Sequence, residues 1–169
     1  LLGTFLTQVY NAVKSLPGVE LDVWFWDVGV VENGKFVVKS PSDINEIIKA
    51  LSGVSNKYGK TIQTGSGTVF APVLEEVEKE MSGPRGVKYP LIFIFSNGAI
   101  ADPNEVAAEL NKIGKKVGLL YAIIINDGGV KNELYNAVMK AAMQSMRNRA
   151  FADAFDAKKI ITEPQKPQP

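Results

Sequence analysis

The sequence contains no cysteine and no histidine among its 169 residues. Without cysteine the chain has no disulfide, no thiolate nucleophile and no zinc–thiolate site. Without histidine it has no Ser-His-Asp triad, no imidazole acid–base catalyst and no histidine-bound metal. These two absences exclude many classes of enzyme.

The chain also lacks an excess of either charge and any long hydrophobic run. Lys and Arg number 19 against 18 for Asp and Glu, a formal net charge of +1, so no overall field favours nucleic acid or an acidic membrane. No apolar run approaches the roughly 20 residues that cross a bilayer, and no signal-peptide pattern is visible. We therefore expect no nucleic-acid partner and no membrane span. Because the first residue is Leu and not Met, we also expect that further residues precede it.

The composition is that of a folded domain. Hydrophobic residues make up 46% of the chain and charged residues 22%, and the length is sufficient for one domain with its own core. We predict a single domain over residues 1–162. Residues 163–169, rich in proline, are predicted to form an extended and poorly ordered tail.

Two continuous apolar runs predict parallel strands enclosed on both faces. The first covers residues 91–95 and ends in Ser96-Asn97-Gly98, and the second covers residues 119–125 and ends in Asn126-Asp127. In open α/β sheets, ligands bind at the carboxyl ends of such strands. We therefore expect both strand ends to meet at one edge, beside the hydroxyl group of Thr68.

The remaining pattern predicts alternating helices and strands. Asn33-Gly34 separates an alternating run from a second short run and predicts a two-residue hairpin turn between antiparallel strands. The alternation as a whole predicts a doubly wound α/β fold, with a mostly parallel sheet, helices on both faces and an antiparallel hairpin at one edge. Helices are predicted over 2–16, 42–53, 71–81, 102–113 and 134–146, and strands over 20–31, 35–38, 91–95, 119–125 and 157–162.

Two aspartates have both a structural and a functional interpretation. Asp102 precedes Pro103 and Glu105, which favours an N-cap with a reciprocal capping box, and a ligand role is the alternative. Asp27 interrupts the apolar register near the end of the first strand, either as a solvated carboxylate or as a group near a site. The glycine-rich loop over residues 64–72 matches neither a P-loop nor a dinucleotide fingerprint.

The order of three motifs resembles the von Willebrand factor A family, which includes the integrin inserted domains. Residues 65–72 are similar to that family's Gly-Gly-Thr loop, and residues 91–98 are similar to its apolar strand ending in Thr-Asp-Gly. Residues 24–27 resemble its strand ending in Phe-Asp or Phe-Ser. The resemblance covers nearly all of the chain. It implies Thr68 and Asn97 as ligands of Mg²⁺ or Mn²⁺, and it implies a surrounding group of Ser66, Ser96, Asp27 and Asp102.

The sequence departs from the family pattern in two places. The family's Asp-x-Ser-x-Ser motif follows a first, central strand, whereas this sequence starts at the helix after it, so the first strand is expected to be missing. Asn97 stands where the family has aspartate, and an amide oxygen brings no full negative charge to a hard cation. A degenerate site is therefore expected, with weak or absent binding of Mg²⁺ or Mn²⁺.

The resemblance implies a protein-interaction, adhesion or assembly module and not an enzyme. A protein partner is expected, such as an AAA ATPase or another copy of the chain. Two alternatives remain open, because a fold does not fix a function. One is a small-ligand-binding or enzymatic α/β domain, for which no pair of nucleophile and base can be named. The other is a purely structural subunit of a larger assembly.

Overall fold

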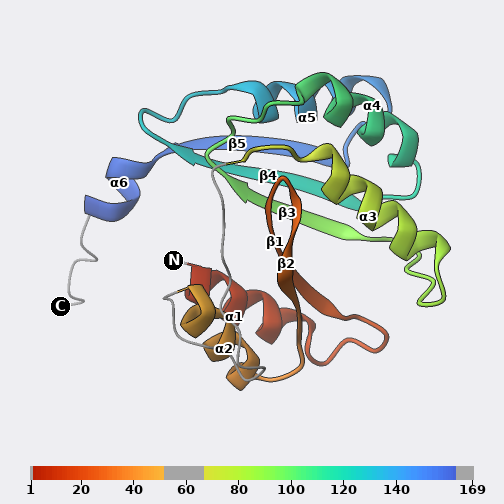
Figure 1. The fold of residues 1–169 in the computed structure, drawn as a ribbon, viewed down its shortest axis with the longest axis vertical. Coiled ribbons are helices and arrows are strands. Elements are labelled where there is room, and N and C mark those ends of the chain that lie inside the picture. Colours follow the sequence, from red (N-terminus) through yellow and green to blue (C-terminus); the bar gives the residue numbers. More distant parts are fainter. Residues whose placement is uncertain (1, 52–66, 163–169) are drawn as a thin grey trace. The chain divides into compact units, whose positions relative to one another are not determined.

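The structure is a computed structural model that describes residues 2–51 and 67–162. The chain divides into two compact units, an N-terminal unit over Leu1–Gly67 and a C-terminal unit over Thr68–Pro169. Figure 1 shows the elements of both units, coloured along the sequence. None of the helices in the described ranges is long and apolar enough to cross a membrane.

The N-terminal unit is an antiparallel hairpin packed against two helices. Its elements are α1 (Leu2–Val13), β1 (Leu21–Asp27), β2 (Gly29–Val38) and α2 (Pro41–Leu51). Both helices are amphipathic, as predicted, and their apolar stripes pack with one face of the hairpin. The buried core of this unit consists of Leu6, Val31, Phe36, Val38, Ile44, Ile47 and Ala50.

The hairpin turns at Val28 and not at Asn33-Gly34, so that prediction was wrong. Cross-strand pairing runs from Leu21 opposite Val38 to Asp27 opposite Gly29, and its register shifts between Trp24 and Trp26. Asn33 does adopt the positive φ expected of it, 59°, but inside the irregular part of β2. A turn at Val28 pairs β1 along its whole length, whereas a turn at Asn33-Gly34 would leave most of β1 without a partner strand.

The C-terminal unit contains a parallel sheet with strand order β3-β4-β5. These strands are β3 (Leu91–Ser96), β4 (Leu119–Asn126) and β5 (Ala150–Asp156), and the first two are the continuous apolar runs predicted to be parallel strands. Figure 1 shows α4 and α5 on the same side of the three strands. The helices of this unit are α3 (Ala71–Ser82), α4 (Pro103–Ile113), α5 (Glu133–Gln144) and α6 (Ala157–Thr162).

The predicted α/β class, parallel strands and antiparallel hairpin are confirmed, but the single doubly wound sheet is not. In the part of the chain that the structure describes, the hairpin and the parallel strands form two separate sheets. The layer of α4 and α5 covers one face of the parallel sheet, whereas helices were predicted on both (Figure 1). The single domain over 1–162 stays a prediction.

The last strand lies seven residues earlier than predicted. Residues 157–162 form α6, and the strand is β5, over Ala150–Asp156. Every second residue of β5 is alanine, which has high helix propensity and low strand propensity, so the pattern gave no strand signal. Ala150, Ala152 and Ala154 pair with Leu120, Ala122 and Ile124, which are buried on the helix side of the sheet. Small side chains there allow α5 to approach β5 closely.

Glu109 of α4 carries a shifted pKa at the contact between α3 and α4. Burial raises the pKa of its carboxyl group, and a hydrogen bond to Glu78 and the negative charge of Glu78 raise that pKa further. The Lys112 ammonium lies 3.2 Å from a Glu78 carboxylate oxygen and lowers the Glu109 pKa in part. The folded chain thus favours the protonated form of Glu109 more than the unfolded chain does.

A Glu109→Gln variant should therefore be more stable than the parent protein at neutral pH. Because the folded pKa is raised, the contribution of Glu109 is fully present below the unfolded pKa and is lost as pH rises through the folded value. The glutamine amide is neutral at every pH and can still donate to Glu78. The advantage of the variant in thermal unfolding should grow between pH 4 and pH 7. An advantage of the same size at both pH values would contradict a raised pKa of Glu109 in the folded chain.

Candidate functional site

Hydrogen bonds from side-chain amides hold the loops at the carboxyl edge of the parallel sheet. The backbone oxygen of Asn97 accepts hydrogen bonds from Asn126 Nδ2 at 3.0 Å and from Asn132 Nδ2 at 2.9 Å. Asn126 also closes its own loop, since its Nδ2 donates to the Val130 oxygen at 2.8 Å and its Oδ1 accepts from the Val130 N–H at 2.6 Å. The ends of β3 and β4 therefore meet at one edge, as predicted.

Ser96 and Asn97 use their side chains to shape the loop after β3. Ser96 Oγ accepts the N–H of Gly98, and Asn97 Oδ1 accepts the N–H of Ala99, each at 2.9 Å. Such local bonds are typical of the turns that serine and asparagine favour. The backbone oxygen of Thr68 accepts the N–H of Ala101 at 2.9 Å, so the structure brings Thr68 to the same end of the unit as Asn97.

Asp102 occupies the N-cap position of α4, as predicted, but its side chain caps α3, so the predicted capping box with Glu105 was wrong. Its carboxylate accepts the N–H of Phe70 at 3.0 and 3.2 Å and the N–H of Ala71 at 2.7 Å. It makes no side-chain cap bond to α4, although α4 does begin at Pro103 as predicted. Phe70 and Ala71 are buried, and their N–H groups at the start of α3 need an acceptor. Asp102 is thus a buried hydrogen-bond acceptor that links the start of α4 to the start of α3.

The other residues named for a cation site are distributed elsewhere. Ser66 lies outside the described residues. Asp27 belongs to the N-terminal unit, where it ends β1 and its Oδ1 accepts the N–H of Val28. Within residues 2–51 and 67–162, no three acidic side chains gather in a metal-binding arrangement. Thr68 and Asn97 therefore stay predicted ligands of Mg²⁺ or Mn²⁺. Their hydrogen bonds from the N–H groups of Ala101 and Ala99 form without a cation.

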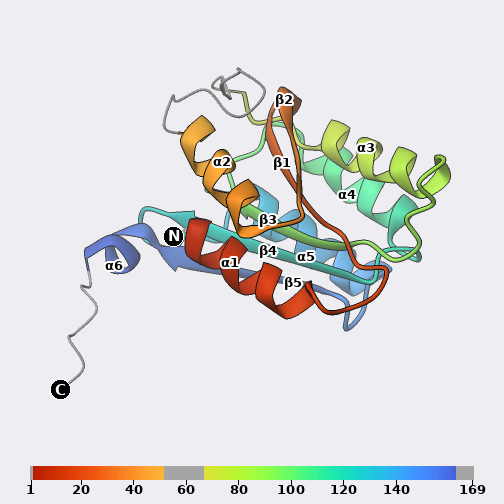
Figure 2. The same ribbon diagram turned by 90° about the horizontal axis from the view of Figure 1, so that it is seen from below.

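The face of the parallel sheet that α4 and α5 do not cover carries a broad apolar surface, here called the outer face. Figure 2 shows the strands from this side. Leu91 is 61% exposed, Phe151 45% and Phe155 41%. Parallel sheets are normally covered on both faces, and exposed apolar patches mark interaction sites. The outer face comprises Leu91, Phe93, Phe95, Leu119, Tyr121, Ile123, Ile125, Phe151, Asp153 and Phe155, which the strand register places on one side.

One carboxylate, Asp153, lies within this apolar surface. The Tyr121 hydroxyl donates a hydrogen bond to Asp153 Oδ2. That bond, then burial, then the negative charge of Asp153 raise the pKa of Tyr121, so the hydroxyl keeps its proton at neutral pH. The Tyr121 ring stacks on Phe93 with its centroid 6.4 Å away. Tyr121 is thus fixed on both sides and holds Asp153 in place.

The sequence did not predict the outer face. The apolar runs of β3 and β4 predict strands covered on both sides, since no polar residue interrupts them. The available signal was the order Phe-Ala-Asp-Ala-Phe over residues 151–155, which alternates strictly. Its large and charged members fall on the outer face, and its alanines fall under α5.

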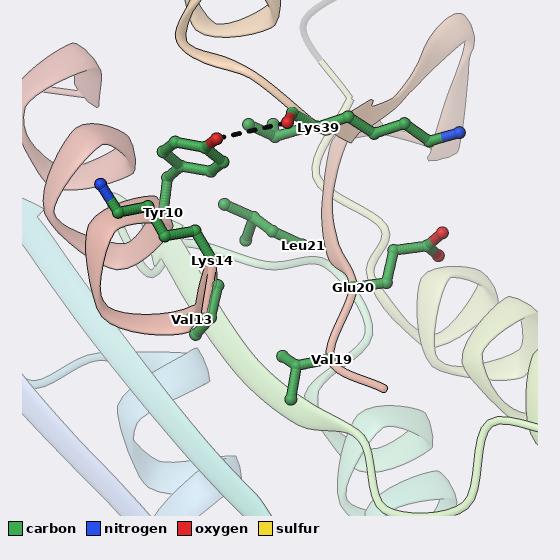
Figure 3. Close-up of a pocket in the computed structure, with 8 residues that line it drawn as sticks. Tyr10, Val13, Lys14, Val19, Glu20, Leu21 and Lys39 are labelled. Carbon is green, nitrogen blue, oxygen red and sulfur yellow. Dashed lines mark hydrogen bonds between the residues drawn. The ribbon is translucent and has the colours of Figure 1, made fainter. Parts of the chain in front are cut away.

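A separate groove of about 280 Å³ lies in the N-terminal unit. Figure 3 shows the ammonium groups of Lys14 and Lys39 directed away from each other, at opposite ends of the groove. The Tyr10 hydroxyl donates to the Lys39 backbone oxygen at 3.3 Å. Polar groups do not converge in this groove, which ligand sites generally require. Its lining is Tyr10, Val13, Lys14, Val19, Glu20, Leu21, Val38 and Lys39.

Comparison of the chain with models of known families, with curated proteins and with solved structures finds no match.

Proposed function

We propose that this chain is a protein-interaction or assembly module, of von Willebrand factor A type, that binds its partner through the outer face. The observation that supports the proposal most is the exposure of Leu91, Phe151 and Phe155 on one face of a parallel sheet. A large apolar side chain contributes about 1.5–3 kcal/mol when it is fully buried. Three such side chains on one face of the sheet therefore favour association with another apolar surface.

The carboxyl edge supports a structural role for most of the residues first considered there. The side-chain oxygens of Ser96, Asn97 and Asp102 accept hydrogen bonds from backbone N–H groups of this unit. Asn126 and Asn132 donate to a backbone oxygen. A weak cation site at Thr68 and Asn97 is the part of the proposal that uses the family resemblance, and docking at the outer face does not require it.

Photo-crosslinking from single cysteines tests the docking proposal. Because these 169 residues contain no cysteine, Phe151→Cys and Glu105→Cys each carry one thiol to which a benzophenone maleimide can be attached. Position 151 lies on the outer face, whereas Glu105 is exposed on α4, on the covered side of the sheet. Both variants are irradiated as the purified protein and in a cell extract.

We expect the label at position 151 to join a second polypeptide, either a partner or another copy, and the label at position 105 to give little or no adduct. Equal yields from both positions would show non-specific capture and would contradict the proposal. The absence of any adduct at position 151, with a folded variant and an active label, would also contradict it.

A further inference from the structure

Asp153 is flanked by two aromatic rings on the outer face. Phe151 and Phe155 are its neighbours two residues away on β5, so all three side chains point to the same face, with Asp153 roughly 7 Å from each of the two along the strand. All three are exposed. Among the residues that the structure describes, Tyr121 is the side chain that pairs with Asp153. Its hydroxyl group donates to the Oδ2 atom of Asp153 and not to Oδ1. Oδ1 is directed to no other donor in the described part of the chain.

A partner that covers this surface must supply a positive charge at Asp153. Burying a carboxylate under an apolar surface without a paired cation is costly, and the pairing also needs good hydrogen-bond geometry. A phosphate or another acidic group would be repelled there, which disfavours nucleic acid as the occupant. The surface therefore selects a partner that is apolar around a single cationic group.

Arginine matches these surroundings better than lysine does. A guanidinium group is planar, binds a carboxylate through paired N–H donors and is less strongly hydrated than an ammonium group. It also stacks on aromatic rings within about 6 Å, where cation–π attraction is effective. The rings of Phe151 and Phe155 lie on either side of the carboxylate that such a group would bind.

We propose that the outer face binds an arginine side chain of a protein partner, with the guanidinium group on the Asp153 carboxylate and between the rings of Phe151 and Phe155. This inference rests on the proposed function, because it identifies the chemistry of the partner surface that the outer face docks. Tyr121 is a positioning residue that orients Asp153 and does not itself touch the arginine.

A pair of synthetic peptides tests the inference. Both are twelve-residue peptides with apolar side chains around one central position, occupied by arginine in the first and by citrulline, its neutral isostere, in the second. Each is titrated into the full chain, with binding followed by calorimetry and located by NMR shifts. The chain is used as the parent protein, as Asp153→Asn and as Glu105→Gln, which removes an exposed carboxylate on the other side of the sheet.

We expect the arginine peptide to bind the parent chain about tenfold more tightly than the citrulline peptide, the usual scale for one charged hydrogen-bonded contact. Asp153→Asn should abolish that difference, and Glu105→Gln should preserve it. A lowered Tyr121 pKa in Asp153→Asn would show that the contact with the Asp153 carboxylate has been removed.

Equal binding of both peptides at the outer face would overturn the arginine inference and leave protein docking intact. If neither peptide binds at millimolar concentration, or if the shifts fall only in the N-terminal unit, both the inference and the docking proposal would fail.

Discussion

Replacing Gly98 by alanine is expected to lower the unfolding free energy of the C-terminal unit by about 2–4 kcal/mol, from left-handed backbone strain and steric overlap together. Gly98 has a φ of +86°, and a Cβ there would lie 2.0 Å from Asn132 Oδ1 and 2.9 Å from Ile124 Cγ2. The new methyl group would displace the Asn132 side chain, whose Nδ2 ties the loop after β3 by its bond to Asn97. The loss should therefore include order at the carboxyl edge.

Gly128 provides a matched control for this substitution. Its φ is +87°, nearly the same, but the nearest atom to an added Cβ is Val130 Cγ2 at 3.8 Å. Gly128→Ala should therefore cost only the backbone strain, about 1–2 kcal/mol. Equal losses in the two variants would show that the close approach of Asn132 does not matter.

The unfolding free energies of Gly98→Ala and Gly128→Ala must be measured with a probe that reports on the C-terminal unit alone. Both tryptophans, Trp24 and Trp26, lie in the N-terminal unit, so their fluorescence reports on the other half of the chain. Hydrogen exchange of the β3 and β4 amides in increasing urea gives the unfolding free energy of the sheet itself.

Replacing Asp102 by alanine should destabilise α3 and its contact with α4. The substitution removes the acceptor for the N–H groups of Phe70 and Ala71, both of which are buried. Loss of a helix cap costs about 1 kcal/mol, and loss of a partner for a buried polar group costs about 1–3 kcal/mol, so a total of about 2–3 kcal/mol is expected. Amide exchange should accelerate first in the first turn of α3.

Asparagine at position 102 is the control for the carboxylate. It keeps the side-chain length and one acceptor oxygen, while the parent carboxylate uses both oxygens, Oδ1 to Phe70 and Oδ2 to Phe70 and Ala71. Asp102→Asn should therefore be less destabilising than Asp102→Ala. If Asp102→Ala leaves the rate of amide hydrogen exchange in α3 unchanged, the Asp102 cap does not stabilise this helix.

The elements that the sequence predicted well are those with a strong local pattern. The runs over 91–95 and 119–125 are continuous and apolar, and they form β3 and β4. The helices with apolar stripes and a proline in the first turn, α3 and α4, also lie where they were expected. Local composition determines such elements largely by itself.

The elements that were wrong depend on distant contacts. Asn33-Gly34 has the local chemistry of a turn, yet the pairing of β1 with β2 places it in an irregular stretch of strand. The alanines of β5 favour a helix locally, and only pairing with β4 and packing under α5 make the segment a strand.

The candidate site shows the same division. The arrival of Ser96 and Asn97 at the carboxyl edge follows from the parallel strands. The contact of Asp102 with Ala71, 31 residues away in the sequence, has no local signal. The outer face was missed because a run of apolar residues does not reveal which element covers each side of the strand.

The rate at which a thiol reagent labels Phe151→Cys, compared with Ala122→Cys, shows whether the outer face is exposed in solution. Position 151 lies on the exposed outer face and Ala122 is buried under the helices of the same sheet. We expect Phe151→Cys to react nearly as fast as the urea-unfolded variant. Ala122→Cys should react at least about 10³-fold more slowly, through opening of the unit. Equally slow labelling at both positions would show that the outer face is covered, and docking of a partner there would be ruled out.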